Sequence, residues 1–413
     1  MVGSGGAGAS SGSGGAGASS GSGGTTSGGG NGGAGVGGST STEGGVMTGG
    51  AGGTAGGGTT GGSGGRVTTD AAADATVVDA TKPADATTPN DTSTATDAPT
   101  VPDGTNPGTT DAGNGADGAD NPTGFAAIPG MGLNTTTGGR GGTRVTVTTF
   151  AELSSYLDSD DTLIMLVQGA IDLGGSMVPM RSNKTLVGLA GARLVNGGIE
   201  MNRRQNIIIR NLTFADGTDD TLKINQNTHH VWVDHCDFSN APDGLFDITR
   251  QSSYITISWN HFHNHSKTML IGHGDDATDD TGYLKTTIHH NWFDGTEQRH
   301  PRVRFGEVHV FNNYFLSNAL YGVASTMEAD VVVEGNYFEG VAYPTYVGYD
   351  ASGPGDLVER NNVYDNSGTP QTRGTAFDPS AAYPYVVDDP APLRPVIRTK
   401  TGVGVIDPMK AAQ

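Results

Sequence analysis

The chain has 413 residues with 23 basic and 43 acidic side chains, which gives a formal net charge of −20 at pH 7. This charge slows encounter with a polyanion, and we expect no nucleic-acid partner. The single cysteine, Cys236, excludes an intrachain disulfide and a cysteine-rich metal site. No apolar run approaches the ~20 residues that a membrane-spanning helix needs, so we expect no membrane span.

Residues 1–122 differ in composition from the rest of the chain. Gly and Ser dominate the first part, Thr, Ala, Asp and Pro dominate the second, and large apolar side chains are almost absent. Such a segment cannot bury enough apolar surface to offset its chain entropy, so we predict a disordered linker. Aspartates recur every six residues from Asp79 to Asp103, but a short solenoid would need aliphatic residues at its inward positions.

Residues 123–413 are numerous enough for one large domain, and a monomer is our default expectation. The N-terminus lacks a charged region followed by an apolar stretch, so no signal peptide is visible. A long Gly/Ser leader is suited to holding an exported domain away from a surface. We therefore expect a secreted protein that this linker could tether to the cell surface and whose secretion signal lies upstream.

A capping helix is predicted near the start of the domain. Thr149 and Glu152 have the spacing of a capping box, and Phe150, Leu153 and Leu157 follow at helical spacing. A short amphipathic helix here would close the open end of a solenoid. The Pro- and Ala-rich stretch after residue 370 is expected to pack along the outside.

One sequence phrase returns seven times from residue 207 onward, each time with a β-branched alternating stretch that ends in an aromatic residue. These aromatic residues are Phe214, Phe238, Phe262, Phe293, Phe315, Phe338 and Tyr364. Spacings of 22 to 31 residues are typical of a solenoid whose units bury their apolar faces against one another. An all-β parallel β-helix is therefore predicted.

Asparagines stand two residues before five of these aromatic positions, at Asn260, Asn291, Asn313, Asn336 and Asn362. A buried amide must be hydrogen-bonded, and an identical amide on the next coil supplies both a donor and an acceptor. We predict an asparagine ladder; scattered turn asparagines are the alternative. Cys236 takes the same offset in an earlier coil, so we expect a packed interior residue rather than a reactive thiol.

A column of charged residues follows the same repeat, because Asp220, Asp243, Lys267 and Arg299 stand five or six residues after successive aromatics. Neighbouring coils lie roughly 4.8 Å apart, so four equivalent positions span about 14 Å, the size of a polymer groove. Asp247 could join Asp243 at one ion only if the chain bends, and Gly244 permits a bend. Clustered carboxylates favour a hard cation such as Ca²⁺, and a solvated acidic edge is the alternative.

Eleven histidines fall between His229 and His309, and such a cluster could indicate a zinc site. His261, His263 and His265 alternate along one strand and His289 adjoins His290, so most of them cannot converge on one centre. We expect structural or surface histidines.

Four blocks in chain order resemble the signature of the pectate/pectin lyase family of right-handed parallel β-helices: VWVDHCDF, DGLFDI, HNHSKTMLIGH and RHPRVRFG. The resemblance covers about residues 123–365. It implies that Asp220, Asp243 and Asp247 are Ca²⁺ ligands; the family's further acidic ligand aligns with Thr218, and Asp216 or Asp219 could replace it. The loop that contains Asp275, Asp276, Asp279 and Asp280 could hold another cation.

The resemblance also implies that Lys267 binds the substrate carboxylate, that Arg299 is the catalytic base, and that Arg304 and Arg302 bind substrate. The implied reaction is Ca²⁺-dependent β-elimination on polygalacturonate, giving 4,5-unsaturated oligogalacturonates. Arg299 is an unexpected base, since a guanidinium ordinarily stays protonated; nearby positive charge would disfavour its charged form. A carboxylate clamp is the alternative role for this residue.

Three other functions remain open from the sequence. A pectin lyase acting on methyl-esterified polymer would lack the Ca²⁺ carboxylates. A polygalacturonase-type hydrolase would need two carboxylates around a water, and Asp234 and Asp237 are the candidates. A surface adhesin displaying a β-helix on a long stalk is the third, because fold alone does not specify function.

Overall fold

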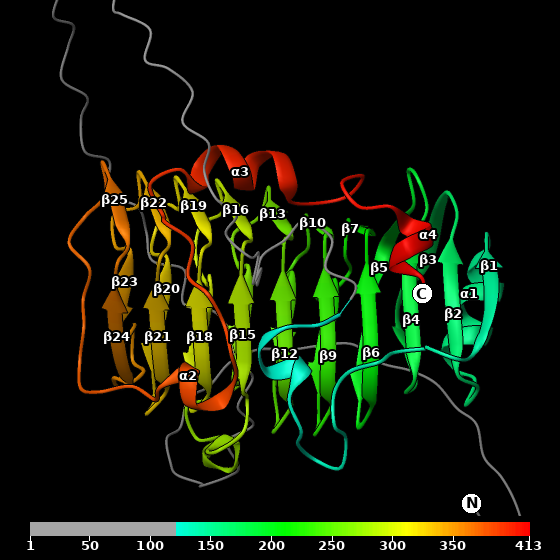
Figure 1. Ribbon diagram of the computed structural model, residues 1–413, viewed down its shortest axis with the longest axis horizontal. Helices are drawn as coiled ribbons and strands as arrows, with labels where there is room; N and C mark the ends of the chain where they lie inside the picture. The colour runs from blue at the N-terminus through cyan, green and yellow to red at the C-terminus, as the bar shows by residue number, and fades with distance from the viewer. Residues whose placement is uncertain (1–120) are drawn as a thin grey trace, which may run out of the picture. The chain divides into compact units, whose positions relative to one another are not determined.

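The computed structural model describes residues 121–413, and the predicted linker lies outside this part of the chain apart from its last two residues. The described residues form a parallel β-helix in which every strand ladder is parallel (Figure 1). Ten strands form one face, one strand to a coil. In order they are β1 (Thr143–Val147), β2 (Leu163–Val167), β4 (Lys184–Gly188), β6 (Gln205–Arg210), β9 (His229–Asp234), β12 (Ser253–Ser258), β15 (Thr286–His289), β18 (Glu307–Phe311), β21 (Asp330–Glu334) and β24 (Asp356–Arg360).

The other fifteen strands form a sheet that divides at β5 (Arg193–Asn202), because the two halves of β5 pair with different strands. β3 (Ala170–Pro179) pairs with β5. We call the two parts of this sheet, on either side of β5, the site face and the histidine face. The site face consists of β8 (Leu222–Asn225), β11 (Phe246–Ile248), β14 (Met269–Ile271), β17 (Arg302–Arg304), β20 (Val323–Thr326) and β23 (Thr345–Val347). The histidine face consists of β7 (Thr213–Ala215), β10 (Asp237–Ser239), β13 (His261–His263), β16 (Trp292–Asp294), β19 (Tyr314–Leu316), β22 (Tyr337–Glu339) and β25 (Val363–Asp365).

The predicted register of the repeats is confirmed. The seven aromatic residues pair in register and stack inside the coils, with neighbouring ring centroids between 4.3 and 5.4 Å apart. The asparagine ladder also forms, since the Nδ2 of each of the first four asparagines donates to the Oδ1 of the next one at 3.0 Å. Cys236 extends the ladder through its backbone N–H, and burial raises the pKa of its thiol.

The predicted capping helix is α1 (Phe150–Leu157), which lies beside β1 and β2 in Figure 1. Its capping box forms through Thr149 and Glu152, and Leu153 and Leu157 are buried. Phe150 departs from the predicted apolar stripe, because it is 37% exposed at the first helical position. The described residues contain no helix long and apolar enough to cross a membrane.

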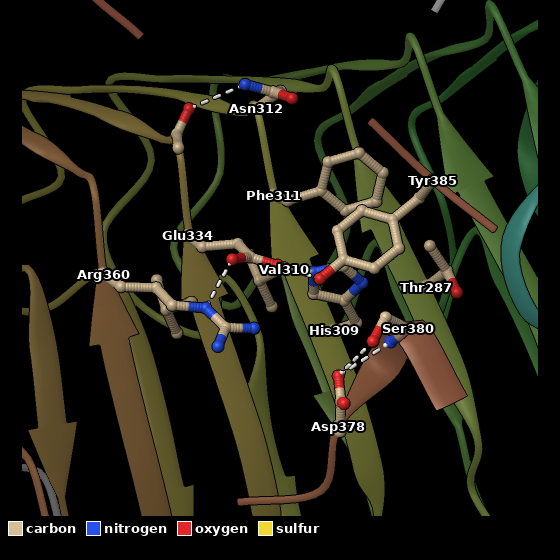
Figure 2. Close-up of polar contacts among 12 residues, drawn as sticks. Thr287, His309, Val310, Phe311, Asn312, Glu334, Arg360, Asp378, Ser380 and Tyr385 are labelled. Carbon is tan, nitrogen blue, oxygen red and sulfur yellow. Dashed lines mark hydrogen bonds and ion pairs between the residues drawn. The ribbon is translucent and has the colours of Figure 1, made fainter. Parts of the chain in front are cut away.

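The C-terminal stretch packs on the outside of the coils, as predicted. It carries α2 (Pro379–Ala382), α3 (Leu393–Lys400) and α4 (Pro408–Ala411), and α3 covers β19 through Leu393 and Ile397 (Figure 1). Tyr385 of this stretch donates a hydrogen bond to Glu334 (Figure 2). Two short 3₁₀ helices complete the described elements, η1 (Gly124–Ala127) and η2 (Thr278–Asp280).

Candidate active site

The charged column lies where the chain passes from the histidine face to the site face. Asp220 precedes β8, Asp243 precedes β11, Lys267 precedes β14 and Arg299 precedes β17. Backbone bonds fix these connections coil to coil: the N–H of Leu245 donates to the carbonyl of Lys267, and that of Met269 donates to the carbonyl of Arg299. The repeat phase therefore brings the four residues onto successive coils.

Gly244 holds two of the carboxylates close together. A Cβ at Gly244 would lie 2.5 Å from Asp247 Oδ1 and 2.7 Å from Asp220 Oδ1. The Gly244 N–H also donates to Asp220 Oδ1 at 2.8 Å. A glycine is required here because the backbone passes between two carboxylates and leaves no space for a side chain.

Asp243 and Asp219 complete the acidic group. Carboxylate oxygens of Asp219, Asp220 and Asp243 all lie within 4.8 Å of one another. Asp247 lies outside this group of three but adjoins Asp220 across Gly244, so Asp220 is the link between the three predicted metal ligands. Asp219 joins them, while Asp216 instead accepts a hydrogen bond from Asn240.

The electrostatics of this group favour a bound cation. Burial raises the pKa of Asp247 to about 8, with a further contribution from the charges of Asp220 and Asp243. Burial also raises the pKa of Asp220, although Lys223 opposes this effect. Two adjacent buried carboxylates are costly to ionise without a counter-charge, and a divalent cation supplies one.

Lys223 was not predicted from the repeat phase. Its Nζ lies 2.8 Å from Asp220 Oδ2 and 2.9 Å from Asp219 Oδ2. Burial lowers the pKa of Lys223, but the hydrogen bonds to the two carboxylates outweigh this and raise it. The sequence carried a signal for this residue, because Lys223 and Asp247 are one 24-residue repeat apart and pair in register.

The two basic residues of the column, Lys267 and Arg299, differ in exposure and in their hydrogen-bond partners. Lys267 Nζ lies 3.2 Å from Asp243 Oδ1 with its side chain 36% exposed. Arg299 is half-buried, and its Nε has no hydrogen-bond partner within residues 121–413. Lys267 therefore adjoins the acidic group with an accessible ammonium, whereas the Arg299 Nε is buried near Asp247.

Arg302 and Arg304 are held by neighbouring loops. Arg302 is only 9% exposed, donates to Ser352 Oγ at 2.6 Å and lies over the ring of Tyr349. The structure thus places Arg302 as a buried side chain held by two loop residues, and its role in substrate binding stays a prediction. Arg304 donates to Asp275 Oδ1 at 2.6 Å from a position nearer the surface.

The loop aspartates do not form the additional cation site that we expected. Asp275 is engaged by Arg304 and Ser352, and Asp280 accepts a hydrogen bond from the Gln251 N–H at 2.6 Å. Within the described part of the chain, these aspartates contribute to no group of three converging ligands.

The two candidate carboxylates of a hydrolase do not face one water. Asp234 is 1% exposed on β9 and forms an ion pair with Arg210 at 2.8 Å. Asp237 lies on β10 of the histidine face and contacts His261 and His263. Asp234 and Asp237 therefore do not form the acid–base pair that a hydrolase would need.

Comparisons with known proteins agree with this geometry. The family model described as pectate lyase matches residues 112–389. A pectate trisaccharide-lyase of Bacillus licheniformis is 36% identical, covering 69% of this chain and 87% of its own length. One of Thermotoga sp. strain RQ2 is 37% identical, covering 69% and 89%.

Solved structures show the same fold. A pectate lyase from Bacillus sp. N165, solved in complex with trigalacturonate, matches with a TM-score of 0.60 and 29% identity over 69% of this chain and 100% of its own. A pectate lyase variant from Xanthomonas campestris matches with a TM-score of 0.60 and 26% identity over 69% and 98%. The chain therefore belongs to the pectate lyase family, a family of polysaccharide lyases.

Proposed function

We propose that this pectate lyase requires Ca²⁺ and cleaves polygalacturonate by β-elimination, releasing 4,5-unsaturated oligogalacturonates. The observation that carries the proposal is the pair Asp220 and Asp247, which meet across Gly244 beside Asp243. Lys267 and Arg299 adjoin this acidic group on the next coils. One position thus offers ligands for a cation and donors for an acidic sugar.

The carboxylates fit Ca²⁺ by their chemistry. Ca²⁺ prefers oxygen ligands and tolerates irregular geometry, and Asp220, Asp243 and Asp247 would hold it, with Asp219 as a further ligand. The bound ion would withdraw charge from the uronate carboxylate and so acidify the proton on carbon five. Such a site would also let an acidic protein bind a polyanion, because the bound cation and the neighbouring basic side chains make the site locally positive although the net charge of the protein is negative.

The protein's own side chains then carry the elimination. Arg299, acting as a neutral guanidine, takes the proton from carbon five, the electron pair of that bond forms the double bond between carbons four and five, and the glycosidic oxygen leaves carbon four and takes up a proton from water. Lys267 stabilises the negative charge that develops on the substrate. Arg304 binds a substrate carboxylate, for which it shares or releases Asp275.

A single assay tests the proposal. The protein is incubated with polygalacturonate, with and without a chelator, while ultraviolet absorbance of unsaturated product and reducing ends are both measured. We expect chelator-sensitive absorbance. Reducing ends without absorbance would indicate a hydrolase, no product at all would indicate an adhesin, and chelator-insensitive cleavage of methylated pectin would indicate a pectin lyase.

We also infer that the protein acts outside the cell. A polymer of many charged sugars does not cross a membrane, so its lyase must meet it there. Detecting the protein in the culture medium or on the cell surface supports this inference, and finding it only in the cytoplasm contradicts it.

A further inference from the structure

A second group of possible metal ligands lies on the histidine face, away from the acidic group of the active site. His261 and His263 both project from the outer side of β13, and Asp237 on β10 is in register with His261. His263 Nε2 lies 3.1 Å from Asp237 Oδ1, and His261 Nδ1 lies 3.2 Å from Asp237 Oδ2. Ligand atoms of all three residues lie within 4.8 Å of one another.

The first imidazole is held in one orientation from several sides. The ring of His261 is stacked between those of His263 and Trp292, with centroid distances of 4.4 and 4.3 Å. Its Nε2 lies 3.3 Å from the carboxylate of Asp294. A carboxylate on the far nitrogen of an imidazole is a common arrangement around protein-bound zinc, because it fixes the tautomer and makes the other nitrogen a better ligand.

The group is accessible to an ion. Asp237, His261 and His263 are half-buried and line a cavity of about 650 Å³ whose wall includes Val403 and Gly404. This C-terminal segment is bound to the coils, since the Gly402 N–H donates to the carbonyl of Trp259 and the Gly404 N–H donates to Asn211 Oδ1. The cavity thus lies between the histidine face and the segment that links α3 to α4.

We propose that Asp237, His261 and His263 form a transition-metal site with zinc as the preferred ion. Two imidazoles and one carboxylate are a set of zinc ligands that leaves a fourth position open to water. The imidazoles distinguish this site from the all-carboxylate group, which suits Ca²⁺. Zinc bound here stabilises the folded protein by mass action. This role is separate from pectate cleavage.

This arrangement was not predicted from the sequence, because only convergence among the histidines themselves was considered. His265, the third of the alternating histidines, turns away and contacts the backbone carbonyl of Asp243 at 2.6 Å. The third ligand is instead an aspartate one coil earlier, found only when Asp237 and His261 are known to pair.

Zinc titration of the full chain by calorimetry, in excess Ca²⁺ to occupy the acidic group, tests the proposal. We expect one zinc site, with a dissociation constant that rises at least about tenfold in Asp237→Asn and in His263→Ala, and about tenfold in Asp294→Asn. Co²⁺ in place of zinc should give the visible absorption of a four- or five-coordinate ion, which reports the ligand geometry directly.

Two controls separate this site from others. His273 is a matched histidine beside a carboxylate, 3.4 Å from Asp280, and His273→Ala should leave zinc affinity unchanged. Asp243→Asn should also leave it unchanged. The proposal is wrong if no saturable zinc binding occurs, if Asp237→Asn and His263→Ala bind zinc like the parent, or if either control variant abolishes binding.

Discussion

Lys223 places its ammonium nitrogen 2.8 Å from the carboxylate of Asp220, inside the acidic group that we propose for Ca²⁺. The Asp220 side chain is only 3% exposed, so this ion pair satisfies a charge that water cannot reach. A cation entering the group must share the carboxylate with Lys223 or displace its ammonium. Lys223 would therefore compete with the proposed Ca²⁺ ion for this carboxylate.

Replacing Lys223 by Met should strengthen Ca²⁺ binding. The substitution keeps an unbranched side chain one atom shorter than lysine and removes one positive charge next to Asp220 and Asp219. A partly exposed ion pair contributes about 1 kcal/mol, so we expect the Ca²⁺ dissociation constant to fall about fivefold in calorimetry. Thermal stability without Ca²⁺ should fall as well. Weaker Ca²⁺ binding in Lys223→Met would mean that Lys223 supports the site rather than competes for it.

The repeats made much of the fold predictable. One aromatic and one asparagine recur at fixed offsets, so the register of the coils and the position of the charged column could be read directly. The position of Lys223 beside the acidic group was not predicted, because only residues that follow the aromatics were aligned. Lys223 instead lies on a strand and pairs with Asp247.

Contacts between non-equivalent parts of the chain were not predictable. The Gly404 N–H reaches Asn211 across 193 residues, and no periodicity signals such a bond. The same applies to Arg302, whose burial depends on Ser352 and Tyr349 from a distant loop. Position within a repeat indicates which face a residue occupies, but it does not show which loop covers that residue.

Gly244→Ala should damage both the fold and the metal site. The added Cβ would lie 2.5 and 2.7 Å from two carboxylate oxygens, so Asp247 and Asp220 must separate. Overpacking of this kind costs about 1 to 3 kcal/mol, and we expect that loss in urea unfolding together with at least tenfold weaker Ca²⁺ binding. Gly353→Ala is the matched control, because its Cβ would meet only Met327 Sδ at 3.6 Å. Equal behaviour of the two variants would contradict the close approach at Gly244.

Glu334 should make stability depend on acid pH. Burial alone would raise its pKa, but hydrogen bonds from His309, Arg360 and Tyr385 outweigh burial and lower the pKa from 4.5 to about 2 (Figure 2). The unfolded chain therefore binds the proton more readily. The contribution of Glu334 to the free energy of unfolding is complete above pH 4.5 and is lost as pH falls toward 2.

Urea unfolding of wild type and Glu334→Gln between these pH values measures this contribution. The variant should be less stable at neutral pH, and its stability should decline less steeply on acidification. Burial lowers the pKa of His309 and the contact with Glu334 opposes this, so His309 adds a decline of the same sign in both proteins, and a larger one in the variant, where that contact is weakened. Asp160→Asn, at a carboxylate that is 87% exposed, should keep the wild-type slope. Parallel curves for wild type and Glu334→Gln would refute the assignment.

Arg299→Lys tests the assignment of the base. Lysine keeps the positive charge near Asp247 but removes the guanidinium, whose Nε lacks a partner within the described residues. Loss of a general base costs about 10²- to 10⁴-fold, so turnover of polygalacturonate should fall by at least that factor. Calorimetric Ca²⁺ affinity should stay unchanged because no metal ligand is altered. The matched variant Arg304→Lys should chiefly raise KM, since its proposed role is to bind a substrate carboxylate. Near-normal turnover in Arg299→Lys would leave Arg299 as a carboxylate clamp and move the search for the base to another residue.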